Sequence, residues 1–256
     1  MNIGVANKQV KEMSIRALDS ATHEALLSGL YVPESRFGVW FLGTEIWSKH
    51  VLKRAIEDLD RLIENRHSSY PVIVDVGCGF GRSFKMLSDR FRPAQMVGID
   101  LDPKMLAGSV REAKRQGLQV EFKCASGSSL PLADQSVDLV FCHQTFHHLV
   151  EQHKALGEFH RVLKHDGVLL FAESTSKYIR SWIIRLLFRH PMHVQRTAPE
   201  YLGMISNAGF KIHPGSVSYP YLWWSRADLA IMERWFGFAP PSDREETLIN
   251  LVAIRD

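Results

Sequence analysis

The stretch VIVDVGCGFG, residues 72–81, decides the fold. Residues 72–76 are apolar apart from Asp75 and form a short predicted strand, which runs into glycines at positions 77, 79 and 81. Glycine lets a backbone turn tightly and approach a ligand closely, and a helix that begins behind such a turn offers free N–H groups. The next predicted strand, 96–100, ends in Asp100, which is placed to accept hydrogen bonds from a ribose diol. This stretch therefore predicts a strand–turn–helix unit that holds a ligand containing a ribose.

The spacing of the glycines separates two kinds of ligand. A dinucleotide-binding turn has the pattern GxGxxG, and its third glycine would fall at position 82, which is Arg82. Here the pattern is GxGxG, and Asp75 precedes the first glycine by two residues. An acidic side chain at that position favours a ligand with a cationic amino-acid tail. Such a ligand, unlike a dinucleotide, has no pyrophosphate that the turn would have to bind.

Strand and helix patterns alternate after this turn. Helices are expected over 81–90, 103–116 and 154–163, and strands over 72–76, 96–100, 120–123, 137–142 and 167–172. Strands separated by helices at this spacing imply parallel βαβ units with right-handed crossovers. An amphipathic helix is expected before them, over 49–64, and a helix over 199–207 with two closing strands over 210–219 and 248–254 is expected after them.

This pattern predicts one domain, 1–256, with four parts. They are a helical N-terminal extension (1–70), a cofactor-binding core (71–173), a lid-like insertion (174–198) and a C-terminal helix with the closing strands and an aromatic-rich insertion (199–256).

Composition narrows the class of protein. The chain has 256 residues, 45% hydrophobic and 23% charged, with a net charge of +3, which are ordinary values for a soluble globular enzyme. No apolar stretch reaches the roughly eighteen residues of a membrane span. No apolar run follows the N-terminal lysines, and the three cysteines stand singly. The sequence therefore predicts a cytoplasmic protein with free thiols.

Four motifs, in order along the chain, resemble those of the class I S-adenosylmethionine-dependent methyltransferases. They are the glycine turn at 72–81, the acidic loop VGIDLD at 97–102, the run LPLADQSVDLV at 130–140 and the helix and turn EFHRVLKHDG at 158–167. The likeness is greatest to the group that contains the quinone-biosynthesis C-methyltransferases and many small-molecule methyltransferases. It implies an α/β fold of the Rossmann type, with a seven-stranded, mostly parallel sheet, helices on both faces and an antiparallel last strand.

The resemblance also implies S-adenosyl-L-methionine as cofactor. The cofactor-binding residues that it implies are Asp75, Gly77, Gly79, Gly81, Asp100, Leu101, Ser126, Gly127 and His143. Asp100 would hold the ribose, Gly77 and Gly79 would lie behind the methionine moiety, and His143 would lie beside the sulfonium. Ser126 and Gly127 would flank the adenine. Many relatives carry an acidic or amide side chain near Ser126, so the contact with the adenine amino group is weaker here.

The loop after the strand at 137–142 is where groups that act on the methyl acceptor belong, since open α/β sheets bind ligands at the carboxyl ends of their strands. It reads CHQTFHHL, residues 142–149. His147 or His148 could take a proton from a hydroxyl or an activated carbon, and Glu173, at the end of the neighbouring strand, could orient one of them. These three are the candidate catalytic residues. The alternative is that the histidines only cap the next helix or pack.

Other chemistry in this loop is disfavoured. Cys142 invites comparison with the nucleophile of cytosine-5 methyltransferases, but no proline precedes it and strand alternation places it in the core. The loop lacks the Asn/Asp-Pro-Pro-aromatic signature of enzymes that methylate planar exocyclic amines, which argues against DNA as a substrate. His143 and His147 are the only histidines near the site four residues apart, and no metal site is expected.

The segment YIRSWIIRLLFRH, residues 178–190, places three arginines among apolar side chains. It is expected to be a lid over the acceptor, a membrane contact with arginines at the headgroups, or a helix packed on the core. A second aromatic cluster lies within 219–238. Both segments favour a small-molecule acceptor that is apolar or aromatic. Whether the chain forms a homodimer is left open by the sequence.

Two alternative functions stay open as well. The first is RNA methylation. It is suggested by the excess of basic over acidic residues and by the lysines and arginines of 104–123, although no nucleic-acid-binding module is visible. The second is a non-catalytic regulatory protein that binds S-adenosylmethionine, which would need a degenerate acceptor loop.

Overall fold

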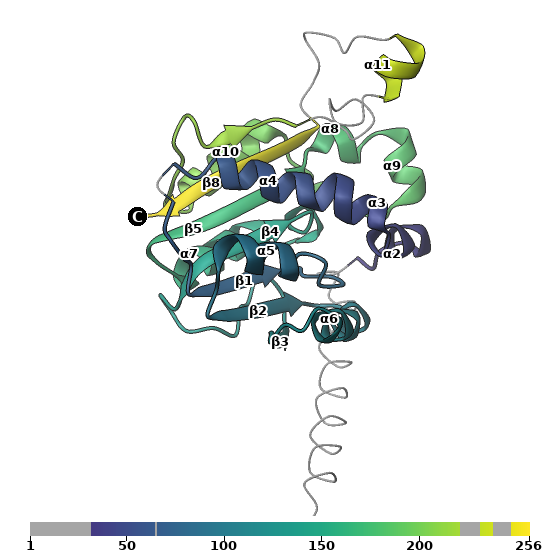
Figure 1. Cartoon of the computed structure of the whole chain (residues 1–256). Coiled ribbons are helices and arrows are strands. Elements are labelled where there is room, and N and C mark those ends of the chain that lie inside the picture. Colours follow the sequence, from purple (N-terminus) through teal and green to yellow (C-terminus); the bar gives the residue numbers. More distant parts are fainter. Residues whose placement is uncertain (1–31, 65, 221–230, 238–246) are drawn as a thin grey trace, which may run out of the picture.

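The computed structural model describes residues 32–64, 66–220, 231–237 and 247–256. Its strands are β1 (Val72–Val76), β2 (Gln95–Asp100), β3 (Glu121–Cys124), β4 (Val137–His143), β5 (Leu163–Ser174), β6 (Phe210–Lys211), β7 (Val217–Ser218) and β8 (Leu248–Arg255). They form one sheet in the order β3-β2-β1-β4-β5-β8-β6, with β7 also paired to β8. The strands from β3 to β5 are parallel, and β8 is antiparallel to β5 (Figure 1). The α/β sheet of the Rossmann type is confirmed.

The helical elements before and within the core are α2 (Arg36–Leu42), α3 (Glu45–Trp47), the π-helix η1 (Ser48–Leu52), α4 (Lys53–Arg61), α5 (Phe84–Phe91), α6 (Pro103–Arg115), the 3-10 turn η2 (Phe146–His148) and α7 (Gln152–Val162). After β5 come α8 (Ser176–Ile179), α9 (Trp182–Leu187), the 3-10 turn η3 (Met192–Val194), α10 (Ala198–Asn207) and α11 (Ile231–Phe236).

The sheet has eight strands where seven were expected, because the strand expected over 210–219 is divided in two. β6 and β7 pair with opposite parts of one edge of β8, Phe210 with Arg255 and Ser218 with Asn250. Pro214 and Gly215 lie in the interruption between them. Proline has no N–H to donate to a strand ladder, so pairing stops there.

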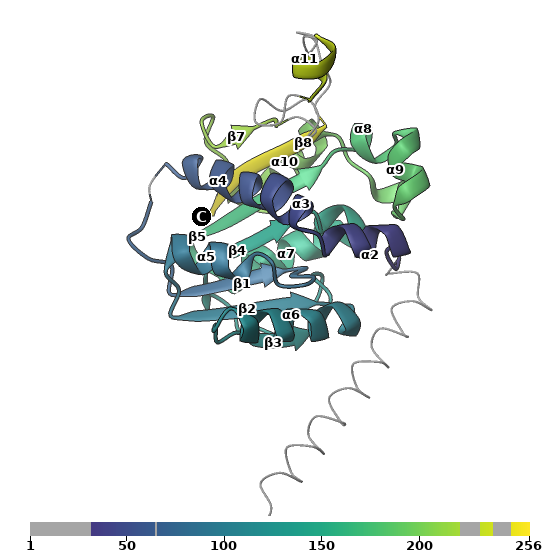
Figure 2. The same ribbon diagram turned by 45° about the vertical axis from the view of Figure 1, so that its right-hand side comes forward.

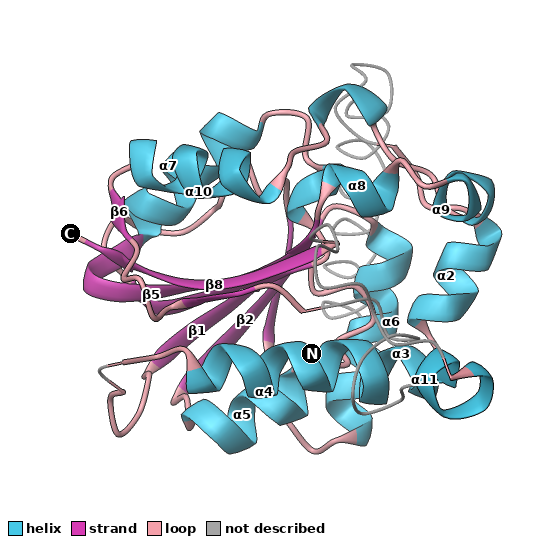
Figure 3. Cartoon of the chain, turned by 90° about the horizontal axis from the view of Figure 1, so that it is seen from above, coloured by secondary structure: helices cyan, strands magenta, loops and turns pink. Residues whose placement is uncertain are grey.

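Two hydrophobic layers cover the two faces of the sheet, and β4 shows how the sequence produces them. Leu139 and Phe141 pack with buried residues of α4 and α5, whereas Val140 and Cys142 pack with α7 and α10. Alternate strand residues point to opposite faces, so one buried strand contributes to both layers. Figure 3 shows α4 and α5 on one face of the sheet and α7 and α10 on the other. Cys142 is fully buried, as the alternation predicts, and burial raises the pKa of its thiol well above the usual range.

Capping residues determine where the helix after the acidic loop begins. Asp102 caps α6 by accepting hydrogen bonds from the backbone N–H groups of Lys104 (2.7 Å) and Met105 (3.3 Å), and Pro103 occupies the first turn. The helix expected over 49–64 is α4 preceded by η1, and the expected apolar face of α4 is buried at Ala55, Ile56 and Leu59. Residues 1–31 of the expected N-terminal extension lie outside the described residues.

The segment 178–190 is not one helix: it contains the end of α8 and all of α9. Ser181 interrupts it, and its hydroxyl donates to the carbonyl of Tyr178 (2.7 Å). α9 packs beside α2, where the ring of Phe188 meets Phe37 and Phe41 at 5.5 and 5.9 Å between centroids. α8 follows the carboxyl end of β5, and α9 lies next to α2 on the same side of the sheet (Figures 1 and 2). The segment 178–190 therefore lies at the edge where the parallel strands end, which is the edge at which open α/β sheets bind ligands.

Among the described residues no helix is long and apolar enough to cross a membrane. Most of the aromatic cluster expected within 219–238 lies outside the described residues. Tyr219, Trp235 and Phe236 are described, and all three are exposed.

Candidate active site

The glycine turn after β1 has the geometry that its sequence requires. Gly77, Gly79 and Gly81 have φ angles of 74°, 52° and 70°, which L side chains rarely adopt. The N–H groups of Gly77 and Cys78 both donate to the carbonyl of Ile99 (2.7 and 3.0 Å), which ties the turn to β2. A side chain on Gly77 would collide with Thr145, whereas one on Gly79 would meet only Met105 Sδ at 3.9 Å. The backbone at Gly79 therefore faces open space.

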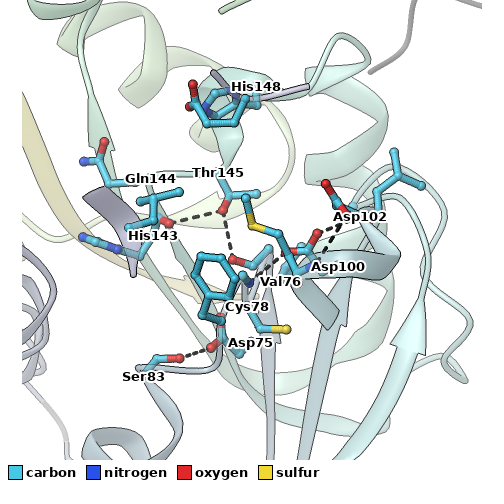
Figure 4. A pocket seen from close by; sticks show the side chains of 18 of the residues that line it. Asp75, Val76, Cys78, Ser83, Asp100, Asp102, His143, Gln144, Thr145 and His148 are labelled. Carbon is cyan, nitrogen blue, oxygen red and sulfur yellow. Dashed lines mark hydrogen bonds and ion pairs between the residues drawn. The ribbon is translucent and has the colours of Figure 1, made fainter. Parts of the chain in front are cut away.

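Asp100 joins this turn to the acidic loop (Figure 4). Its Oδ2 accepts from the N–H of Gly79 (2.8 Å), and its Oδ1 accepts from the N–H of Asp102 (2.9 Å). Asp75 is buried at the end of β1 and accepts a hydrogen bond from the hydroxyl of Ser83. Burial raises the pKa of Asp75 to about 7 and that of Asp100 to about 6. Burial therefore disfavours the ionised form of both carboxyl groups, and a bound cationic ligand would stabilise that form.

These residues line one cavity, whose empty volume is about 1100 Å³ with open solvent at its mouth included. Of the predicted cofactor-binding residues the cavity is lined by Asp75, Gly77, Gly79, Asp100, Leu101, Ser126, Gly127 and His143. Gly81 is not among the lining residues, and a side chain there would strike the ring of Phe84 at 2.5 Å. The hydroxyl of Ser126 lies 2.9 Å from that of Ser128, which donates to Glu151 (3.0 Å).

A second cavity adjoins the first, and the two share part of their walls. The shared lining residues are Glu34, Leu42, Trp47, Gln144 and His148. Most of the remaining wall of the second cavity is apolar or aromatic: Phe41, Val51, Tyr178, Ile179, Ile184, Phe188 and Leu248. Its other lining residues are His147, Ser174 and His190. α2, α3, α8 and α9 therefore enclose an apolar space with imidazoles at one side.

The predicted pairing of Glu173 with a histidine is present, and the histidine is His147. Its Nδ1 lies 2.5 Å from Glu173 Oε2, and both side chains are buried. The other carboxylate oxygen of Glu173 accepts from the backbone N–H groups of Thr145 (2.8 Å) and Phe146 (2.7 Å). Fixed by these bonds, Glu173 holds the ring of His147 with Nε2 as its remaining nitrogen.

His148 has a different environment. Its Nε2 lies 4.0 Å from Glu34 Oε2, and its ring packs on His147 and on His190 with centroid distances of 4.3 and 4.8 Å. Burial lowers the pKa of His148 well below its usual range and that of His190 to about 3. Both imidazoles are therefore neutral near pH 7, and each keeps a nitrogen lone pair.

Sequence patterns did not indicate three residues of this region, namely Glu34, Trp47 and His190. Glu34 and Trp47 precede the core in segments without a motif, and the Trp47 ring packs edge-on against His143 at 5.4 Å between centroids. His190 is 42 residues after His148, and only the tertiary fold brings the two rings to 4.8 Å between centroids. The one available signal was an apolar segment rich in arginine and ending in a histidine.

Comparisons with known proteins agree with this geometry. Residues 74–171 match the family model described as a methyltransferase domain. Over this part of its length the chain is similar to methyltransferases. A demethylmenaquinone methyltransferase of Thermus thermophilus is 34% identical over 57% of this chain and 65% of its own length. A malonyl-[acyl-carrier protein] O-methyltransferase of Methylovorus is 32% identical over 48% of this chain and 42% of its own length.

The solved structures share the fold of this chain. A S-adenosylmethionine-dependent methyltransferase from Aquifex aeolicus superposes with a TM-score of 0.59 at 17% identity, over 86% of this chain and 97% of the other. The two curated relatives are matched over less than two thirds of their own lengths.

Proposed function

We propose that this chain is a methyltransferase, which transfers a methyl group from S-adenosylmethionine to a small apolar or aromatic acceptor. The observation that carries the proposal is the pair of adjoining cavities with His148 in the wall of both. The first cavity has the glycine turn and the two buried carboxyl groups suited to a cationic cofactor with a ribose. The second has the apolar wall suited to the acceptor.

The predicted cofactor contacts follow from this placement. Asp100 would accept from the ribose hydroxyls, and the open space over Gly79 would take the methionine moiety. His143 would lie near the sulfonium, held between Trp47 and Phe141 at centroid distances of 5.4 and 5.9 Å. The adenine would lie by Ser126 and Gly127. Because the Ser126 hydroxyl is engaged with Ser128, its bond to the adenine would be weak.

Catalysis needs alignment and, for a protonated acceptor, removal of a proton. We propose that His147, His148 and Glu173 supply the polar end of the acceptor cavity, where the nucleophilic atom would lie. That atom would attack the methyl carbon as the carbon–sulfur bond breaks, leaving S-adenosylhomocysteine. Glu173 would act on the acceptor only through His147, so it is a positioning residue.

The division into a core and a lid is part of the proposal. Residues 174–198 would act as the lid of a single domain, because α8 and α9 supply Tyr178, Ile179 and Ile184 to the second cavity.

The outer surface of α8 and α9 exposes large apolar side chains: Trp182 and Leu186 are 77% and 74% exposed, and Trp40 of the adjacent α2 is 62% exposed. We propose that this surface contacts a lipid bilayer, with the nearby arginines at the headgroups. Sedimentation with anionic vesicles that is lost in Trp182→Ser would support it, whereas concentration-dependent dimerisation without vesicles would favour a homodimer.

A screen of small hydroxylated and aromatic compounds tests the function itself. The purified chain would be incubated with S-adenosylmethionine and each compound, and both S-adenosylhomocysteine and the methylated product would be measured by mass spectrometry. A product of increased mass supports the proposal. Turnover on total RNA alone would favour an RNA methyltransferase. Tight cofactor binding without turnover on either would favour a regulatory protein.

A further inference from the structure

Three histidines from two separate segments meet at one side of the acceptor cavity. His147 and His148 come from η2, and His190 comes from the stretch that follows α9. One ring nitrogen of each lies within 4.8 Å of a ring nitrogen of the others. We propose that this cluster binds a first-row divalent metal ion, with Zn²⁺ the best match, and that the ion holds the acceptor. The role in catalysis rests on the proposed methyl transfer, whereas metal binding does not.

The hydrogen bond to Glu173 prepares His147 as a ligand. Histidines that bind metals commonly donate their other N–H to a carboxylate, which fixes the tautomer and increases the basicity of the ligating nitrogen. Glu173 Oε2 is 2.5 Å from His147 Nδ1, so Nε2 carries the free lone pair. Glu173 is itself held by two backbone N–H groups (2.8 and 2.7 Å) and does not need to move.

The other two imidazoles have little else to bind. Among the described residues, no side-chain hydrogen bond is found for the ring of His148 or of His190, although both lie in the cavity wall. The nearest acidic group is Glu34, whose Oε2 is 4.0 Å from His148 Nε2. Oε1 of Glu34 accepts from the N–H groups of Ser35 (2.6 Å) and Arg189 (3.2 Å), which keeps the carboxylate beside the cluster.

The number and kind of these donors match a catalytic zinc site, in which three protein ligands leave a fourth position for water or substrate. In a tetrahedral site, zinc–nitrogen bonds of about 2.1 Å place two ligating nitrogens about 3.4 Å apart. The ring nitrogens lie within 4.8 Å of one another, so the widest pair would have to close by up to about 1.4 Å. The backbone near them is anchored, since Gln195 donates to the carbonyls of His147 (2.8 Å) and Pro191 (3.0 Å). Rotation of the histidine side chains would therefore have to supply this closure.

A metal at this point would act on a hydroxyl or enol acceptor. Coordination of the acceptor oxygen lowers its pKa, so its proton is lost to water. The oxygen, or the enolate carbon conjugated with it, then forms a bond to the methyl carbon while the carbon–sulfur bond breaks and its electron pair stays on sulfur. The products are the methylated acceptor, S-adenosylhomocysteine and one proton. The open fourth position faces the acceptor cavity, because the histidines line it.

Titration of the untagged full-length chain with Zn²⁺ and with Co²⁺ tests the site. Stripped of metal, the chain should bind one ion at micromolar concentrations, and the Co²⁺ form should show the visible absorption bands of a site with nitrogen ligands. His190→Gln and His147→Gln should each weaken binding by about 100-fold or more. Glu173→Gln should weaken it by about 10–100-fold, the range for a partner of a metal-binding histidine. His165→Gln is the matched control, since this histidine is exposed and remote from the cluster.

Parallel titration with S-adenosylhomocysteine separates this proposal from the proposed function. Each variant should keep the cofactor affinity of the wild type, which also shows that it is folded. A chain that binds S-adenosylhomocysteine but neither ion, or that binds the ions equally well as His190→Gln, overturns the metal site alone. A chain that binds Zn²⁺ through these histidines but not S-adenosylhomocysteine leaves the metal site standing and overturns the cofactor proposal.

Discussion

The backbone N–H of Gly79 donates to the carboxylate of Asp100 at 2.8 Å, so the acid that faces the cofactor cavity also holds the glycine turn in place. The same carboxylate accepts from Asp102, at the cap of α6. One side chain thus connects the turn after β1, the end of β2 and the start of α6. Its removal should affect both the ligand and the loop that surrounds the ligand.

We expect Asp100→Ala to lower the affinity for S-adenosylhomocysteine by about 10–150-fold. This corresponds to the roughly 1.5–3 kcal/mol of a hydrogen bond to a charged group. Isothermal calorimetry measures the change. Asp89→Ala, at an exposed position on α5, is the matched control and should bind normally. Unchanged affinity in Asp100→Ala would show that the ribose lies elsewhere.

The cofactor-binding role of the glycine turn can be tested by comparing the same substitution at two glycines with similar backbone angles. In Gly79→Val the new side chain would occupy the open space above the turn, and the chain should lose measurable binding of S-adenosylhomocysteine. Gly117→Val has a similar backbone angle, 68° against 52°, with nothing within 4 Å of the added carbon. Both variants should lose about 1–2 kcal/mol of stability from backbone strain, but only the first should lose binding. Equal binding in the two would mean that the space above Gly79 is not the cofactor site.

Asp75 predicts how the stability of the ligand-free chain depends on pH. Burial raises its pKa from 3.8 to about 7, so the folded state binds more protons than the unfolded state between about pH 4 and pH 7. The free energy of unfolding should therefore fall across this window as pH rises, by on the order of a few kcal/mol. Asp100, with a pKa raised to about 6, contributes in the same direction up to that pH.

Asp75→Asn removes one of these groups. Its curve of unfolding free energy against pH, from urea denaturation, should be flatter than that of the wild type, and the variant should be the more stable of the two at pH 8. Two parallel curves would show that Asp75 is ionised in the folded chain at all these pH values.

Glu173 should matter for folding as well as for catalysis. Glu173→Ala leaves the N–H groups of Thr145 and Phe146 and the ring of His147 without their buried acceptor. We expect a loss of about 3–5 kcal/mol in the free energy of unfolding, the usual cost of removing one partner from a buried charged group. Urea denaturation measures it, with the exposed Glu45→Ala as control. A loss below about 1 kcal/mol would mean that the loop is held by other contacts.

The sequence was sufficient for the core because the chemistry there depends on residues close together in the chain. The glycine pattern at 77–81 and the acid at the end of β2 indicate their own conformations, and the strands that carry them have nearly the predicted bounds. The pairing of Glu173 with a histidine also followed from strand order. Two parallel neighbouring strands place their carboxyl ends at the same edge.

The acceptor side could not be predicted in the same way. Glu34, Trp47 and His190 belong to segments whose positions depend on tertiary packing, such as the contact of Phe188 with Phe41 between α9 and α2. No periodicity in the sequence records that contact. The break at Ser181 was missed for a related reason, because a serine within an apolar run gives only a weak signal against a helix.

The two cavities share only part of their walls, which has a consequence for how this chain could change. The cofactor cavity is built mainly by the turns that end β1, β2 and β4, whereas the acceptor cavity depends largely on α2, α3, α8 and α9. Substitutions at Phe41, Ile184 or Phe188 alter the size of the acceptor space at positions that do not line the cofactor cavity. Selection could therefore adapt the chain to a new acceptor while its affinity for the proposed methyl donor stays constant.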